Sequence, residues 1–133
     1  MESKTLEGFN LLLIEEEVLI AMDIEQLCYE MGAATVTIVS SLADLPHDML
    51  DEKRVNAAIM DVKLGNEWIF GFAHRLMDRR IPFIFATGHT DIETFLHEFP
   101  GVAVVSKPYA HEELAEALTQ TVTRRKPQLS GDC

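Results

Sequence analysis

The sequence predicts an α/β fold built on a doubly wound, five-stranded parallel sheet. Five short apolar runs, rich in β-branched residues, alternate along the chain with amphipathic segments of helical periodicity. The chain has 133 residues, of which 47% are hydrophobic, which suits one globular domain. Such alternation implies right-handed crossovers, and for five strands it favours the order 2-1-3-4-5.

The predicted strands are nearly continuous in apolar character, as expected of strands that are covered on both faces. They are FNLLLI (9–14), ATVTIV (34–39), VNAAIM (55–60), PFIFAT (82–87) and VAVVS (102–106).

Apolar residues at helical spacing fill the segments between these runs. The second predicted helix is the weakest, because Pro46 interrupts it. The predicted helices are a first one through Ile20, Ile24, Leu27 and Met31 that stops at Gly32, a second from Leu42 to about Glu52, a third from Leu64 to Arg80 that carries Trp68, a short fourth through Ile92, Phe95, Leu96 and Phe99, and a last one through Leu114, Leu118 and Val122.

Composition narrows the class of protein. We expect residues 1–8 to form an N-terminal extension, 9–125 the folded domain and 126–133 a flexible tail. The N-terminus lacks an apolar signal core and no apolar stretch could span a bilayer, so we expect a cytoplasmic protein with no membrane association. Two cysteines make no disulfide framework.

The net charge of −11 opposes nucleic-acid binding. There are 22 acidic residues against 11 lysines and arginines, and such a field repels phosphates. The one basic run, at 124–126, lies near the end of the last predicted helix, where cations meet the negative end of the helix dipole.

Polar residues follow the apolar runs at the points where the predicted strands end. Three glutamates, at 15–17, follow the first run, Asp61 follows the third, Thr87 ends the fourth, and Lys107 with Pro108 follows the fifth. Taken singly, the glutamates are typical of a solvated helix start and Asp61 of a capping or loop acid. In the predicted topology, however, the acids converge at the switch point between strands 1 and 3.

Together these groups form a coherent set for phosphoryl chemistry. Clustered carboxylates can hold a hard cation, and Mg²⁺ fits best because it accepts one or two carboxylates plus phosphoryl oxygens and water. A carboxylate can also accept a phosphoryl group as an aspartyl phosphate. A hydroxyl and an ammonium would then meet the anionic oxygens, so that catalysis is mainly positioning and charge neutralisation.

In this order and at strand ends, the motifs resemble those of response-regulator receiver domains, which have a CheY-like, flavodoxin-like (βα)5 fold. The family has an acidic pair after strand 1, here Glu15 and Glu16, and an acceptor Asp after strand 3, here Asp61. It has Thr or Ser after strand 4, here Thr87, and Lys–Pro after strand 5, here Lys107. The resemblance covers about residues 10–123 and assigns 9–125 to a receiver domain.

The resemblance implies a function. Asp61 would be phosphorylated by a histidine kinase or a histidine phosphotransferase, with Mg²⁺ held directly by Glu16, largely through water by Glu15, and by the backbone carbonyl of Lys63. Thr87 would turn toward the phosphoryl group and Lys107 would pair with it. This change would remodel the face of helix 4, strand 5 and helix 5, which would bind a downstream protein or a second copy of the chain.

Within the family, PFIFATGHT (82–90) resembles the PFxFATGY signature of the FAT GUY receivers, which are largely stand-alone proteins of general-stress and related signalling. His89 replaces the signature Tyr, and we expect it to tune the lifetime of the phosphoryl group. Glu16 stands where receivers usually have Asp, which predicts weaker Mg²⁺ binding. Val104 replaces the usual switch aromatic, and Tyr109 offers an alternative aromatic, although packing at the start of the last helix is its simpler role.

The sequence thus favours a single-domain response regulator that is a phosphoacceptor rather than an enzyme, with no residues left for an output domain. Two alternatives stay open. A pseudo-receiver that acts as a constitutive adaptor would explain Glu16 and Val104. A flavodoxin-like cofactor or metal-dependent hydrolase module has less support, because acids rather than a glycine-rich phosphate loop follow the first strand.

Overall fold

The computed structural model describes residues 5–45, 50, 55–61, 63–64, 67–88 and 97–125. Its elements in chain order are β1 (Asn10–Ile14), α1 (Val18–Glu30), β2 (Thr35–Val39), the 3₁₀ turn η1 (Leu42–Asp44), β3 (Ala57–Met60), β4 (Lys63–Leu64), β5 (Glu67–Trp68), α2 (Phe70–Asp78), β6 (Phe83–Thr87), β7 (Val104–Ser106) and α4 (His111–Arg125).

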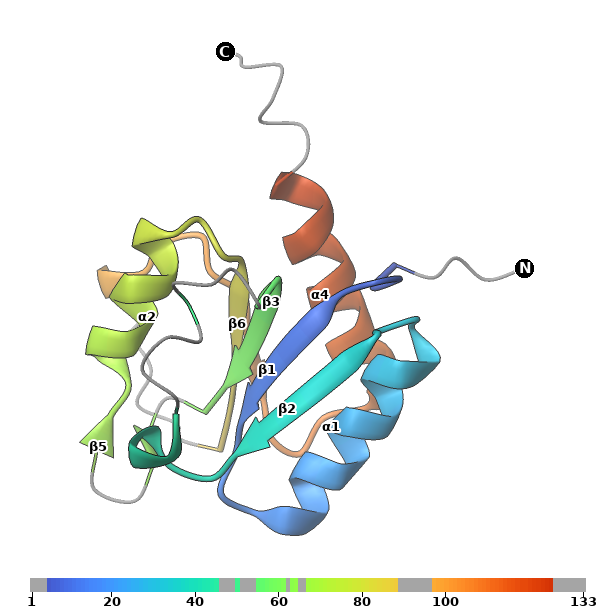
Figure 1. Ribbon diagram of the computed structural model, residues 1–133, viewed down its shortest axis with the longest axis horizontal. Coiled ribbons are helices and arrows are strands. Elements are labelled where there is room, and N and C mark those ends of the chain that lie inside the picture. Colours follow the sequence, from blue (N-terminus) through green and yellow to red (C-terminus); the bar gives the residue numbers. More distant parts are fainter. Residues whose placement is uncertain are drawn as a thin grey trace.

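The five long strands form one parallel sheet in the order β2-β1-β3-β6-β7. This is the predicted order 2-1-3-4-5, so the predicted fold class is confirmed. Figure 1 shows α1 and α4 on one face of the sheet and α2 on the other. The switch point lies between β1 and β3, and the carboxyl ends of these strands lie beside those of β6 and β7.

Both faces of the central strands are buried because successive side chains of a strand point to opposite sides. In β1, Leu11 and Leu13 belong to the core beneath α1 and α4, whereas Leu12 and Ile14 belong to the core beneath α2. All four are at most 1% exposed, which explains the unbroken apolar run in the sequence.

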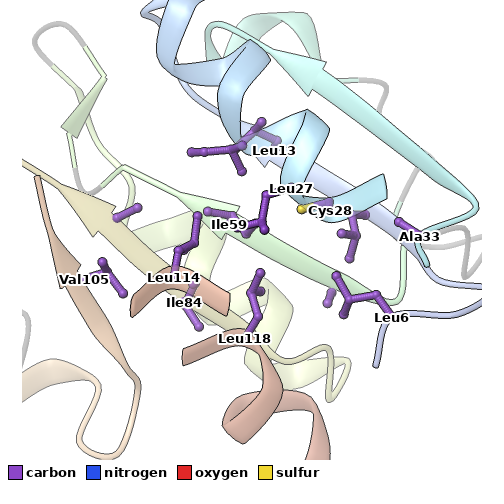
Figure 2. Close-up of a cluster of buried hydrophobic side chains, with 14 of the residues drawn as sticks. Leu6, Leu13, Leu27, Cys28, Ala33, Ile59, Ile84, Val105, Leu114 and Leu118 are labelled. Carbon is purple, nitrogen blue, oxygen red and sulfur yellow. The ribbon is translucent and has the colours of Figure 1, made fainter. Parts of the chain in front are cut away.

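The core beneath α1 and α4 is shown in Figure 2, where Leu27 and Cys28 of α1 meet Leu114 and Leu118 of α4 over the central strands. Burial raises the pKa of the Cys28 thiol to about 12, with a further contribution from the charge of Glu25. This thiol therefore stays protonated and acts as a packing residue.

Residues 5–8, expected from the sequence to belong to an N-terminal extension, form a turn whose Leu6 is fully buried in the same core. The Leu6 amide donates to the Met31 carbonyl at 2.9 Å, and the Gly8 amide donates to that of Gly32 at 3.2 Å. These contacts connect the turn to the end of α1.

Aromatic rings dominate the core beneath α2. Phe99 lies 6.0 Å from Phe83 and 5.7 Å from Phe85, between ring centroids, in edge-on arrangements that aromatic pairs prefer. The His74 ring of α2 lies 4.8 Å from that of Phe99 at a tilt of 41°, and its Nε2 atom lies 2.6 Å from Glu98 Oε2. The segment before β7 is thereby attached to α2.

The predicted helices differ from the structure in one clear respect. The prediction of a helix from Leu64 is wrong, because 63–64 and 67–68 pair as a short antiparallel hairpin and α2 begins only at Phe70. Of the second predicted helix, the described residues show the 3₁₀ turn η1, and most of the fourth predicted helix lies outside the described residues. In the described part of the chain, no helix is long and apolar enough to cross a membrane.

Candidate functional site

The ends of four parallel strands bring the candidate site together through backbone hydrogen bonds. The Asp61 amide donates to the Ile14 carbonyl at 3.2 Å, which places the residue after β3 beside the end of β1. The Lys107 amide donates to the Thr87 carbonyl at 2.8 Å, which places the residue after β7 beside the end of β6. Residues far apart in sequence thus share one edge of the sheet.

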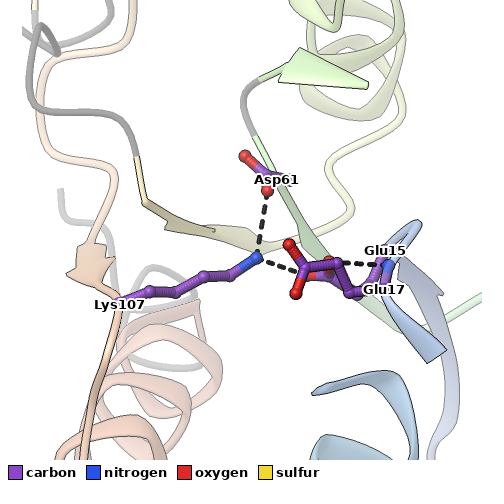
Figure 3. Close-up of polar contacts among 4 residues, drawn as sticks. All are labelled: Glu15, Glu17, Asp61 and Lys107. Atoms are coloured by element: carbon purple, nitrogen blue, oxygen red, sulfur yellow. Dashed lines mark hydrogen bonds and ion pairs between the residues drawn. The ribbon is translucent and has the colours of Figure 1, made fainter. Parts of the chain in front are cut away.

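Lys107 is the centre of the site. Its Nζ atom donates to Glu15 Oε1 at 2.7 Å and to Asp61 Oδ2 at 3.1 Å. Figure 3 shows the lysine side chain reaching across the strand ends to the two carboxylates. The three side chains are 13%, 2% and 12% exposed, in the order Lys107, Glu15, Asp61, so solvent screens their charges only weakly.

The electrostatics favour a charged lysine. Burial lowers the pKa of Lys107, but its hydrogen bonds to Glu15 and Asp61 and their negative charges outweigh burial and raise the pKa above the ordinary lysine value. The second carboxylate oxygen of Glu15 accepts the Glu17 backbone N–H at 3.1 Å. Glu15 is therefore fixed by a strand end, an ammonium and the start of α1.

Thr87, at the end of β6, is fully buried next to this cluster and opposes Ser106 of β7 in the sheet register. The following residue, Gly88, lies against the lysine stem. A Cβ atom added there would lie 3.9 Å from Cβ and Cδ of Lys107, which is ordinary van der Waals contact. The structure therefore brings together four of the predicted site residues: Glu15, Asp61, Thr87 and Lys107.

The other predicted site residues are not shown in contact with Lys107. Glu16 has an exposed side chain, so the member of the acidic pair that contacts Lys107 is Glu15. Lys63, predicted to offer its carbonyl, lies in β4 opposite Trp68. His89 lies outside the described residues. Val104 is half-buried and packs against the core beneath α2.

Tyr109 packs against the core beneath α1 and α4, and its hydroxyl is buried with no hydrogen-bond partner among the described residues. Burial raises the pKa of Tyr109, and the charges of Glu15, Asp23 and Asp61 raise it further. The ring also lines a pocket of about 530 Å³ between α1 and the segment after β7, together with Leu19 and Pro108.

Two features of the site were not predicted from the sequence. The ion pair of Lys107 with Glu15 joins residues 92 positions apart. His111 of α4 contacts Asp23 of α1 at 2.8 Å, beside the pocket that Asp23 lines. The sequence does contain a signal for the first feature, because charged residues of opposite sign follow strands that the topology places at one edge.

The oxygen donors of the site are of the type that a hard divalent cation prefers. Within the described residues, no group of three or more His, Cys, Asp or Glu side chains is arranged to hold a metal ion. The convergent donors are two carboxylates, Glu15 and Asp61, and both already contact one cationic atom. Two carboxylates with water and a phosphoryl oxygen are an ordinary Mg²⁺ shell, so these residues fit the ion.

Comparisons with known proteins indicate the family to which the chain belongs. No family model and no curated protein sequence matches the chain. Among solved structures it is similar to a response regulator receiver protein from Sinorhizobium medicae, with TM-score 0.77 and 23% identity over 91% of this chain and 99% of that one. It is similar to SdrG from Sphingomonas melonis, with TM-score 0.73 and 31% identity over 92% of this chain and 99% of that one.

A third likeness is to the anti-anti-sigma factor PhyR from Bartonella quintana, with TM-score 0.73 and 26% identity over 92% of this chain. The match spans only 51% of PhyR. The sheet order, the strand-end residues and these likenesses together show the fold of response-regulator receiver domains, and we assign the chain to the receiver-domain family. Its 31% identity to SdrG over nearly all of that chain makes it a relative of that protein.

Proposed function

We propose that Asp61 is a phosphoacceptor and that the chain is a receiver switched by phosphorylation. The observation that carries the proposal is the contact of Lys107 Nζ with Asp61 Oδ2 at 3.1 Å. A buried ammonium beside an acceptor carboxylate is placed to neutralise the charge that a phosphoryl group brings. The charged state of Lys107, favoured by its two carboxylate partners, suits that role.

In the proposed reaction, an Asp61 carboxylate oxygen attacks the phosphorus of a phosphohistidine on a kinase or a histidine phosphotransferase. A P–O bond forms as the P–N bond breaks, and the electron pair and a proton remain on the imidazole. Lys107 then exchanges a carboxylate partner for a phosphoryl oxygen. The buried Thr87, at the adjacent strand end, supplies the hydroxyl that meets another phosphoryl oxygen.

Mg²⁺ would supply charge neutralisation between the carboxylates and the phosphoryl oxygens. Glu15 and Asp61 are the donors that converge in the structure, and Glu16 and the Lys63 carbonyl are the further donors that the family resemblance proposes. The remaining ligands would be water and phosphoryl oxygens.

The output we propose is altered protein binding, through the face that β7 and α4 would form with the fourth predicted helix, most of which lies outside the described residues. The dianionic charge of the phosphoryl group would shift the population of two conformations of this face. We further propose that the protein is a FAT GUY receiver and that it acts in stress signalling. Both proposals are supported by PFIFATGHT at 82–90 and by the likeness to PhyR, which is described as an anti-anti-sigma factor.

The test is phosphate incorporation. The protein is incubated with MgCl₂ and acetyl phosphate or phosphoramidate, and the product is analysed for acid-stable, base-labile phosphate. We expect one phosphate per chain in the wild type and none in Asp61→Asn, which keeps the size of the side chain. Asp78→Asn, at the end of α2, is the matched control and should incorporate normally.

The alternative is a pseudo-receiver that binds its partner without phosphorylation. The specific observation in its favour is that Lys107 already contacts both Glu15 and Asp61, so each carboxylate has a cationic partner without an added ligand. No incorporation from small donors or from a histidine kinase, with partner binding unchanged in Asp61→Asn, would favour this adaptor function.

A further inference from the structure

Exposed apolar side chains gather on α1 and the adjacent edge strand. Among the described residues, six large hydrophobic side chains are exposed, and five of them lie on α1 or β2. They are Val18, Leu19, Met22, Tyr29 and Ile38, whereas the sixth, Met77, lies on α2. In Figure 1, α1 runs beside β2 at the edge of the sheet.

Three of these residues form a stripe on the side of α1 that faces the β2 edge. Val18, Met22 and Tyr29 are spaced i, i+4 and i+11, which places them along one side of a helix. Tyr29 is fixed next to β2, because its hydroxyl accepts the Val36 backbone N–H at 3.1 Å. Ile38, two residues along from Val36 and on the same face of β2, extends the apolar surface.

The stripe borders a hollow of about 520 Å³ that is lined by Met22, Glu25, Gln26, Tyr29 and Glu30. At 3.6 residues per turn, Glu25 and Glu30 lie on opposite sides of the line through Met22 and Tyr29, so the hollow has an apolar centre and acidic edges. It differs from the site at Asp61 and from the pocket at Tyr109, with which it shares no lining residue.

The charge around the hollow has no cationic partner on the helix. α1 carries Asp23, Glu25 and Glu30 and no lysine, arginine or histidine. Glu30 lies in the last turn, where the helix dipole is also negative, so charge and dipole reinforce one another. A cation placed beside Glu25 and Glu30 would relieve this repulsion, and the Tyr29 ring offers it a further attractive face.

We propose that this stripe, Val18–Met22–Tyr29 with Ile38, is a docking surface for a basic amphipathic helix of another protein. Apolar side chains of the partner helix would cover Met22 and Tyr29, and lysines or arginines at the two edges of its apolar face would lie beside Glu25 and Glu30. Helix-in-groove recognition uses such apolar anchors at i, i+3 or i+4 and i+7, with charge complementarity at the rim.

Two other occupants fit the surface less well. A second copy in a two-fold arrangement would bring the same glutamates from both chains together, and a net charge of −11 already opposes self-association. An added β-strand would need the outward N–H of Val36, which already donates to Tyr29.

The test uses a synthetic helical peptide about 14 residues long, with leucine on one face and lysine on the other, and a counterpart with every lysine replaced by glutamate. Binding to the unphosphorylated protein is measured by fluorescence anisotropy and mapped by NMR chemical shifts. We expect the lysine peptide to bind, the glutamate peptide to bind at least tenfold more weakly, and the shifts to centre on Met22, Tyr29 and Ile38.

Variants give the sharper test. Met22→Lys removes an apolar anchor and adds a repulsive charge, so we expect affinity for the lysine peptide to fall at least tenfold. Met77→Lys is the matched control, because this methionine is 47% exposed on α2, against 56% for Met22. Circular dichroism should show both variants folded, since both side chains are exposed.

Three results would overturn the proposal: equal weakening by the two lysine variants, equal binding of the two peptides, or shifts confined to Leu19 and Pro108. A concentration-dependent dimer in sedimentation that Met22→Lys abolishes would instead make a second copy the occupant. Asp61→Asn should leave peptide affinity unchanged, so this experiment is independent of the phosphorylation test.

Discussion

Lys107 Nζ lies 2.7 Å from Glu15 Oε1 and 3.1 Å from Asp61 Oδ2, so one ammonium is the shared counterion of two carboxylates from two strand ends. All three side chains are largely buried. Without this cation, two carboxylates would face one another where water screens them poorly. Lys107 therefore affects both the stability of the fold and the electrostatics of Glu15 and Asp61.

Replacing Lys107 by methionine should lower the stability of the fold. Lys107→Met keeps most of the side-chain volume but removes the charge, and we expect the free energy of unfolding to fall by about 3 kcal/mol in metal-free buffer. Urea titrations with and without MgCl₂ measure the effect. The variant should regain more stability from Mg²⁺ than the wild type does, because the ion can neutralise the two carboxylates. Equal recovery in NaCl of the same ionic strength would contradict a specific cation site.

The identity of residue 16 should set the affinity for Mg²⁺. Glutamate has one more methylene than the aspartate usual in receivers, and Mg²⁺ demands near-ideal octahedral geometry. We therefore expect Glu16→Asp to bind Mg²⁺ more tightly than the wild type, by roughly three- to tenfold if the gain is about 1 kcal/mol. Titration of Trp68 fluorescence, the only tryptophan signal in the chain, measures both affinities. Wild-type binding as tight as that of the variant would refute the expectation.

The sheet could be predicted because buried parallel strands leave continuous apolar runs, as β1 and β3 do, and because five such strands have a preferred order. The start of α2 could not be predicted from the sequence. Leu64, Trp68 and Phe72 satisfy helical spacing, and a pairing of only two residues against two leaves no periodic signal. Local spacing alone does not decide between a helix and a short hairpin.

The candidate site was predictable as a set of strand ends but not as a set of contacts. Asp61, Thr87 and Lys107 follow apolar runs, and topology places them at one edge. Glu15 is buried and Glu16 is exposed, and this difference depends on the backbone conformation directly after β1. Adjacent residues of a strand point to opposite sides, and the sequence gives both the same side chain.

The buried hydroxyl of Tyr109 should be a source of instability. It has no hydrogen-bond partner in the part of the chain that the structure describes, and a buried donor left unsatisfied costs free energy. We expect Tyr109→Phe to raise the free energy of unfolding by about 1 kcal/mol, measured by urea denaturation. Tyr29→Phe is the matched control, because its hydroxyl accepts the Val36 N–H and its removal should destabilise instead. A loss of stability in Tyr109→Phe would show that the hydroxyl makes a contact in solution.

Leu6 should contribute to stability although it precedes the first strand. Its side chain is fully buried beneath α1 and α4, so Leu6→Ala removes apolar contacts and leaves a cavity. We expect a loss of about 3 kcal/mol in the free energy of unfolding. Leu19→Ala makes the same chemical change at a side chain that is 80% exposed, and it should cost little. Similar values for the two variants would mean that residues 5–8 do not pack on the domain in solution.

The contact between His111 and Asp23 should make stability depend on pH. The hydrogen bond from His111 to Asp23 and the Asp23 charge raise the pKa of His111 above its ordinary value of 6.5. A raised folded-state pKa gives stability that is fully present below the unfolded pKa, about 6.5, and is lost as pH rises through the folded pKa. Both side chains are about half exposed, so the effect is small and decreases with salt.

NMR titration of the imidazole resonances measures this effect directly. Asp23→Asn should bring the pKa of His111 back toward 6.5, and its cost in stability relative to the wild type should be greatest below about pH 6.5 while Asp23 is ionised. Glu98→Gln, at the separate His74 contact, is the control and should leave the pKa of His111 unchanged. The contact is refuted in solution if the pKa of His111 is the same in Asp23→Asn as in the wild type. A stability cost of Asp23→Asn that persists at about pH 9 would assign the aspartate a role other than pairing with a protonated histidine, because the imidazole is then neutral.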